Sequence, residues 1–273
     1  MKSSSQNLII AATLCTCAAI GLQSSLAQQT REVSFRKSNQ ASKRDIGSAK
    51  VLEGGVYVYH IFVSDQHSRW GGDEIAIVKN KLAEAYNFIT RQSRQHGKRI
   101  NFVDDFSSFV TLDRRVPVDA HADPEWTEYT INKATGSSSV QLVQKLREQS
   151  KIDSIVICLH VNKAALSYNL AFYKNVSQKY QAERMICFSA YPDGRETSSA
   201  TYAHEVLHLF GAGDLYFPYD NDGRRKSQAA RLFPNDVMYR VDYNINSLNV
   251  GPFTAYRVGW MDKLDPKYDG FED

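Results

Sequence analysis

The stretch T-Y-A-H-E-V-L-H-L-F-G-A-G-D-L-Y, residues 201–216, determines how the rest of the chain is interpreted. His204 and His208 stand four residues apart, so on a helix both imidazoles project from one face, as two ligands of one metal ion must. Glu205 follows the first histidine and can act as a general base without binding the metal. The pattern H-E-x-x-H therefore predicts a metal-dependent hydrolytic site.

The residues after the second histidine make this pattern more specific. Gly211 lies three positions beyond it, where a residue free to adopt a positive φ can end a helix and turn the chain. Asp214 follows three positions later, which gives H-E-x-x-H-x-x-G-x-x-D. A chance match becomes rare once the glycine and the aspartate are counted.

Apolar residues at helical spacing support a helix through this stretch. They form one stripe, with the two histidines at its edge: Ala200, Ala203, Leu207 and Phe210. Ser198 or Ser199 is the expected N-cap. One side of the helix should therefore pack while the next side faces a cleft.

The third metal ligand is predicted by elimination, because catalytic zinc usually takes three protein ligands and leaves one position for water. No histidine follows His208, and the only downstream glutamate is Glu272, the penultimate residue. An aspartate or an upstream histidine is left. Among the downstream aspartates, only Asp214 is tied to the helix by a short glycine-broken turn. We predict that His204, His208 and Asp214 bind one catalytic Zn²⁺.

These residues resemble the metzincin clan of zinc endopeptidases, and a second segment supports the resemblance. Metzincins have a tight turn with a methionine beneath the metal, and residues 235–239, N-D-V-M-Y, look like that turn with Met238 as the methionine. Asp214 matches the rarer variant with aspartate as third ligand, as in snapalysin-like peptidases. The resemblance covers about the last quarter of the chain and implies a zinc endopeptidase with a protein or peptide substrate.

The chain departs from the clan at one position after this turn. Several metzincins place a tyrosine two residues after the methionine, where it can bind the metal or the developing oxyanion, but this chain has Arg240. Tyr239 and Tyr243 are the nearest substitutes. A packing or surface role is favoured for both.

Residues 1–27 are typical of a secretory signal peptide. Lys2 provides the positive start, residues 8–20 are apolar, and small residues precede the cleavage position near Ala27. A membrane anchor is the alternative, but the apolar run is short for a span. We therefore predict a secreted or periplasmic protein. Residues 28–50 are polar and basic and predict a flexible lead or a short pro-segment.

Residues 51–273 are long enough for one metallopeptidase domain with an upper lobe, about 51–211, and a lower lobe, about 212–273. No later segment resembles a membrane span. The formal charge of +3 is too small to indicate nucleic-acid binding. Two cysteines remain after signal cleavage, Cys158 and Cys187, and either a disulfide or two buried thiols is compatible with the sequence.

The pattern of the domain predicts an α/β fold of the zincin-like α+β kind, with a mixed twisted sheet. Strands are expected at residues 56–63, 100–106, 154–161, 167–173 and 184–189, and helices at 73–91, 137–149 and from Pro252 to Gly259. The resemblance implies that residues 167–173 form an antiparallel edge strand that pairs with the substrate. Covering the core is the alternative. Residues 217–231 are expected to form a loop, within a mostly irregular lower lobe.

One other cluster of residues and one other histidine are also potential metal ligands. The cluster Asp119, His121, Asp123 and Glu125 has no recognisable ligand spacing, so a solvated loop is the favoured interpretation. His160 lies near the end of a predicted core strand, where a histidine is more often structural than a ligand.

The sequence therefore favours a secreted zinc endopeptidase. The alternatives are a zinc hydrolase of non-peptide amides or short peptides, and a secreted binding or adhesion protein with a vestigial site. Glu205 argues against the last alternative, because a non-catalytic metal site does not need this carboxylate.

Overall fold

A five-stranded mixed sheet forms the centre of the fold in the computed structural model, which describes residues 47–119, 125–170, 182–216 and 223–271. The strands are β1 (Gly54–Ser64), β2 (Ile100–Thr111), β3 (Ser154–Ala164), β4 (Tyr168–Leu170) and β5 (Arg184–Ala190). Their order is β2-β1-β3-β5-β4, with only β4 antiparallel to its neighbour. The predicted mixed α/β fold class is confirmed, and within the described residues β4 lies at one edge of the sheet, as expected.

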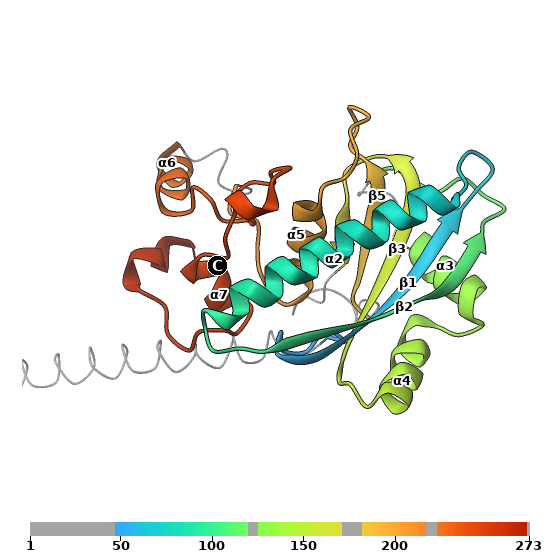
Figure 1. Cartoon of the computed structure of the whole chain (residues 1–273), viewed down its shortest axis with the longest axis horizontal. Coiled ribbons are helices and arrows are strands. Elements are labelled where there is room, and N and C mark those ends of the chain that lie inside the picture. The colour runs from blue at the N-terminus through green and yellow to red at the C-terminus, as the bar shows by residue number, and fades with distance from the viewer. Residues whose placement is uncertain (1–46, 120–124, 171–181, 217–222, 272–273) are drawn as a thin grey trace, which may run out of the picture. The chain divides into compact units, whose positions relative to one another are not determined.

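Helices cover both faces of this sheet, which is why the first eight residues of β3 are all buried. α2 (Gly72–Arg94) and α5 (Ser199–Leu209) pack on one face (Figure 1). α3 (Glu125–Thr135) and α4 (Ser139–Ser150) pack on the other. Alternate β1 residues therefore enter different apolar clusters: Val58 faces α2, and Ile61 faces α3 and α4.

The remaining helical segments of the described residues follow α5 in the sequence. They are α6 (Gly223–Leu232), the 3₁₀ turn η3 (Ile245–Ser247), α7 (Pro252–Arg257) and the 3₁₀ turn η4 (Pro266–Phe271). The loop predicted over residues 217–231 is wrong from Gly223 onward, where α6 begins. Of the polar segment predicted as a loop, Glu125 begins a helix, α3, which buries Trp126 and Ile131, while residues 120–124 lie outside the described residues.

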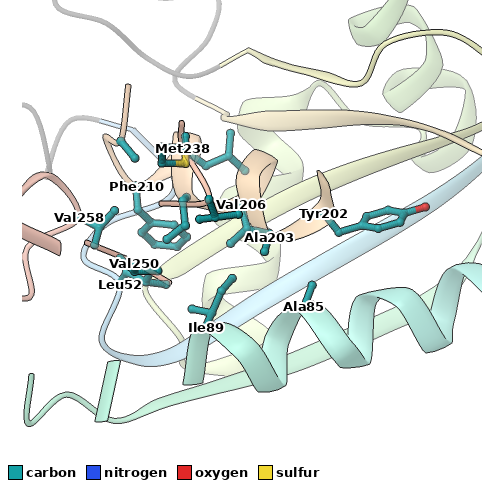
Figure 2. Close-up of a cluster of buried hydrophobic side chains, with 14 of the residues drawn as sticks. Leu52, Ala85, Ile89, Tyr202, Ala203, Val206, Phe210, Met238, Val250 and Val258 are labelled. Atoms are coloured by element: carbon teal, nitrogen blue, oxygen red, sulfur yellow. The ribbon is translucent and has the colours of Figure 1, made fainter. Parts of the chain in front are cut away.

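One apolar cluster joins α2 and α5 to the C-terminal segments. Figure 2 shows Ile89 of α2 and Val206 of α5 beside Met238, Val250 and other buried side chains. The predicted division into lobes near residue 211 stays a prediction. The packed chain already includes Ser48 and Ala49, which are buried before the first strand.

The two cysteines of the domain are free thiols in the structure. Cys158 and Cys187 are buried on neighbouring strands, and their sulfur atoms lie 3.9 Å apart. The sequence was compatible with a disulfide or with two buried thiols, and the structure has two buried thiols.

None of the helices in the described ranges is long and apolar enough to cross a membrane. The predicted signal peptide, residues 1–27, and most of the predicted lead, residues 28–50, lie outside the described residues.

Candidate metal centre

The helix that carries the H-E-x-x-H motif is α5, and all eleven of its residues are buried. Ser198 is its N-cap, with a side chain that accepts a hydrogen bond from the backbone N–H of Thr201. The hydroxyl of Tyr191 contacts Ser198 Oγ at 2.9 Å and Thr201 Oγ1 at 2.6 Å. The start of the helix is therefore held in place by side chains of the preceding loop.

The end of α5 is closed by a Schellman motif. The backbone N–H of Gly211 donates to His208 O at 3.0 Å, and that of Ala212 donates to Leu207 O at 3.1 Å. Gly211 has a φ of +98°, a conformation that L residues with a side chain rarely adopt. The predicted glycine-broken turn is confirmed, and it directs the chain toward Asp214.

Three potential ligand atoms converge at the end of this turn. His204 Nε2 and His208 Nε2 lie 2.9 Å apart, and each lies 3.2 Å from Asp214 Oδ1. The structure thus brings together the three side chains that the sequence predicts as ligands. That they bind a metal stays a prediction.

The hydrogen bonds of the two imidazoles define their tautomers. His204 Nδ1 lies 2.9 Å from Val237 O, and His208 Nδ1 lies 2.9 Å from Ala212 O. A carbonyl oxygen can only accept, so both Nδ1 atoms carry the proton. In the neutral rings both Nε2 lone pairs therefore point toward the common centre, as metal-binding histidines require.

The environment of Asp214 Oδ1 fits a cation at this centre. This oxygen is buried and has no hydrogen-bond donor unless one imidazole gains a second proton. Tetrahedral zinc with bonds of about 2.05 Å places its ligand atoms about 3.3 Å apart, close to the observed 2.9–3.2 Å. When both rings are neutral, three acceptor atoms face one another, and a divalent cation would satisfy all three.

Burial and neighbouring groups shift the pKa values of His204 and Asp214. Burial lowers the pKa of His204, but the contact with Asp214 and the charge of Glu205 outweigh this effect and raise the pKa overall. Burial raises the pKa of Asp214, yet the two imidazoles lower it below the usual range of an aspartate. The carboxylate is therefore ionised at neutral pH.

Glu205 lies on the same helix as the two histidines and is 4% exposed. Its Oε2 accepts a hydrogen bond of 3.3 Å from Asn169 Nδ2, which belongs to the edge strand β4. The carboxylate is thus held between the helix and the strand predicted to line the cleft. The pattern did not identify Asn169, because nothing in the sequence near residue 169 relates it to residue 205.

The turn at residues 235–239 contacts the candidate metal centre through His204. Asp236 accepts hydrogen bonds from Met238 N at 2.8 Å, Gly251 N at 2.9 Å and Thr254 Oγ1 at 2.8 Å. Burial raises the pKa of Asp236 to about 6, although these three donors oppose the shift. Met238 is fully buried in the same apolar cluster as Val206 and Phe210 (Figure 2). The turn therefore presents Val237 O to His204.

The tyrosines near this turn make other contacts. Tyr239 packs against the apolar cluster, and the hydroxyl of Tyr243 donates to Glu196 O at 3.2 Å. Arg240 pairs with Asp242 at 2.9 Å. Tyr216 was not identified from the sequence: its ring lies 6.3 Å from that of His204 at an interplanar angle of 19°.

Comparisons with known proteins add little to this geometry. No family model and no curated protein matches the chain. Among solved structures it is similar to metalloproteinase-II from Bacteroides fragilis, with 9% identity and a TM-score of 0.38 over 83% of this chain. The match spans 61% of that protein's chain. A chaperone–substrate complex matches with 17% identity and a TM-score of 0.33, over 59% of this chain and 24% of that one. Likenesses this weak establish neither a family nor a reaction.

Proposed function

We propose that this protein is a secreted or periplasmic zinc-dependent endopeptidase of the metzincin kind, with aspartate as the third ligand. The proposal depends mainly on one observation: His204 Nε2, His208 Nε2 and the otherwise unpartnered Asp214 Oδ1 converge on one point. These three residues would hold the ion. When bound, zinc would supply a Lewis acid that acidifies water and polarises a carbonyl oxygen.

Glu205 would move the proton during peptide hydrolysis. Its carboxylate would accept a proton from the attacking water and then pass it to the nitrogen of the leaving amine. The hydrogen bond from Asn169 holds one carboxylate oxygen, Oε2, and thereby orients the other. Because Glu205 is buried, bulk solvent competes little for this proton.

The position of β4 supports an extended peptide as the substrate. β4 is an edge strand in the described part of the sheet, and Asn169 joins it directly to the base Glu205. A peptide that added as a further strand would therefore pass close to the catalytic groups.

Replacing Glu205 by Gln tests the proposed base. We expect Glu205→Gln to lower the rate of casein or peptide-library cleavage by at least about 10³-fold, since it removes the proton acceptor, while the zinc content stays equal to that of the wild type. Glu196→Gln makes the same chemical change at an exposed position near the helix and should leave both values unchanged. Full activity in Glu205→Gln would contradict the assignment.

Removal of the metal tests the class of enzyme. Cleavage by the purified protein should stop in the presence of a chelator and return when zinc is added. Cleavage that a chelator does not affect would eliminate a zinc-dependent mechanism.

A further inference from the structure

The turn that contains Met238 contacts the candidate metal centre at two consecutive carbonyl groups. Val237 O accepts a hydrogen bond from His204 Nδ1 at 2.9 Å. Met238 O accepts one from the backbone N–H of Leu215, also at 2.9 Å. Leu215 is buried and directly follows Asp214 in the chain. One short turn therefore holds a proposed histidine ligand by its ring and the proposed aspartate ligand by the adjacent peptide group.

The side chain of Asp236 accepts hydrogen bonds from within this turn and from α7. Its Oδ1 accepts from the backbone N–H of Met238 at 2.8 Å, which closes the turn on itself. Its Oδ2 accepts from Gly251 N at 2.9 Å and from Thr254 Oγ1 at 2.8 Å, where α7 begins. Both carboxylate oxygens are thus used, and together they tie the turn to α7.

The close approach of this carboxylate requires a glycine at position 251. A Cβ atom on Gly251 would lie 2.7 Å from Asp236 Oδ2, closer than a carbon atom can approach an oxygen without displacing it. The φ of Gly251 is −69°, which any residue can adopt, so the backbone conformation does not demand a glycine. Asp236 is 1% exposed and could move aside only by giving up hydrogen bonds.

The chemistry of the three donors requires a carboxylate at position 236. A carboxylate only accepts hydrogen bonds, so it can satisfy the donors on both sides at once. The amide of an asparagine has the same shape but turns its NH₂ group either toward the N–H of Met238 or toward Gly251 and Thr254. Asp236→Asn therefore breaks the link on one side and changes the volume of the side chain little.

We propose that Asp236 is a positioning residue for the metal centre. By holding the turn against α7, it fixes the two carbonyl groups that contact His204 and the residue after Asp214. A group that holds the outer nitrogen of a metal-binding histidine contributes about 10–100-fold to metal affinity. The inference rests on the proposed function only in taking zinc as the ion, since the link from Asp236 to His204 exists without it.

The ring protons of the two histidines test this link without metal or substrate. Nitrogen-15 NMR of the metal-free protein reports which ring nitrogen is protonated and how fast its proton exchanges with water. His208 is an internal control, because its Nδ1–H donates to Ala212 O in the turn that ends α5. We expect Asp236→Asn to accelerate exchange of the His204 Nδ1–H about tenfold, the equivalent of one hydrogen bond, and to leave His208 unchanged.

Zinc affinity tests whether the link reaches the metal centre. Asp236→Asn should weaken zinc binding about 10–100-fold, and Thr254→Val, which removes one of the three donors, should weaken it less. Asp65→Asn is the matched control, because Asp65 is also a buried carboxylate but holds Val116 and Lys163 instead. It should destabilise the fold and leave the zinc affinity and the ring signals of both histidines unchanged.

Several results would overturn the proposal. They are a His204 Nδ1–H that exchanges freely in the wild type, equal acceleration at His204 and His208, and unchanged exchange or unchanged zinc affinity in folded Asp236→Asn. If Asp236→Asn does not fold, Thr254→Val decides, and the proposal then requires faster exchange at His204 alone. A wild type that binds no zinc, combined with selective acceleration at His204, would reject the proposed function and support the link.

Discussion

Asp214 is the residue on which the proposed metal centre depends most. It reaches both imidazoles from outside α5, and its Oδ1 atom is buried without a hydrogen-bond donor. A buried acceptor without a partner is costly, on the order of 1–3 kcal/mol. A bound cation would remove this cost, so the free carboxylate and the ion should stabilise each other.

Removing this carboxylate should therefore release the metal. We expect Asp214→Ala to lose one equivalent of zinc per chain and to weaken binding by more than the roughly 10–100-fold typical of residues outside the ligand shell. Asp242→Ala serves as control, because Asp242 makes an exposed pair with Arg240. Metal analysis after dialysis measures the effect, and unchanged zinc in Asp214→Ala would show that another residue is the ligand.

For individual residues, the sequence predicted contacts best where the residues are close together in the chain. His204, His208 and Asp214 lie within eleven positions, so helical spacing and one glycine turn suffice to predict their convergence. Asn169 and Glu205 come together only because β4 lies beside α5. His60 and His160 are in contact on neighbouring strands but lie a hundred positions apart, and no local pattern relates them.

Among the structural elements, the turn after α5 links the helix to the third ligand. Gly211 needs its positive φ to close the Schellman motif, and an added Cβ would lie 3.3 Å from Arg257 O. Gly213 is two residues further along, and a Cβ there would meet no heavy atom within 4 Å. Only the first glycine is therefore required by the conformation of the turn.

These two glycines provide a matched pair of substitutions. Gly211→Ala should destabilise the fold by about 1–2 kcal/mol, the cost of a left-handed backbone for a residue with a side chain, and should weaken zinc binding by moving Asp214. Gly213→Ala should change both quantities little. Urea unfolding and zinc titration compare the variants, and equal effects of the two substitutions would refute this role of the turn.

A buried ion pair fixes the far ends of β1 and β3. Asp65 accepts hydrogen bonds from Lys163 Nζ, from Val116 N at 2.7 Å and from His67 N at 2.8 Å. Burial raises the pKa of Asp65, but these donors outweigh it and lower the pKa overall. Because the folded pKa lies below the unfolded value of about 3.9, ionised Asp65 stabilises the fold above that pH, and this contribution is lost as the pH falls.

Substitution of the lysine should therefore have a pH-dependent effect. At pH 7 we expect Lys163→Met to lower the free energy of unfolding by about 3 kcal/mol, since it leaves a buried carboxylate without its cation. The difference from the wild type should shrink as the pH falls, because removal of the lysine raises the pKa of Asp65 in the folded variant, so its buried carboxylate takes up a proton at a higher pH than in the wild type. Lys267→Met, in an exposed pair with Asp265, should have little effect at any pH. A deficit that stays constant down to pH 2 would contradict the role of this pair.

The elements that the sequence missed lack a clear apolar period. α6 begins G-R-R-K-S-Q, which shows no stripe, so its polar composition resembled a loop. α3 has few apolar positions, so its sequence shows no clear stripe. That Trp126 is buried against the sheet is seen only in the structure. The strands and α2 were predicted because their apolar residues repeat regularly over several turns or pleats.

For the whole molecule, the fold packs the helix that carries the candidate metal centre against one face of the sheet. α5 carries His204 and His208, while the ring of its Tyr202 lies 6.3 Å from the ring of His160 on β3. The same apolar cluster packs α5 against α2, β1, β3 and the turn that holds Met238 (Figure 2). The position of the proposed catalytic residues therefore depends on packing contributed by most of the described chain.

Anomalous diffraction at the zinc absorption edge, from crystals grown with zinc, tests the central claim most directly. We predict a strong peak about 2 Å from His204 Nε2, His208 Nε2 and Asp214 Oδ1. If crystals of the folded, zinc-supplied protein show no peak at this position, the three side chains do not form a metal centre, and the proposed peptidase mechanism is wrong.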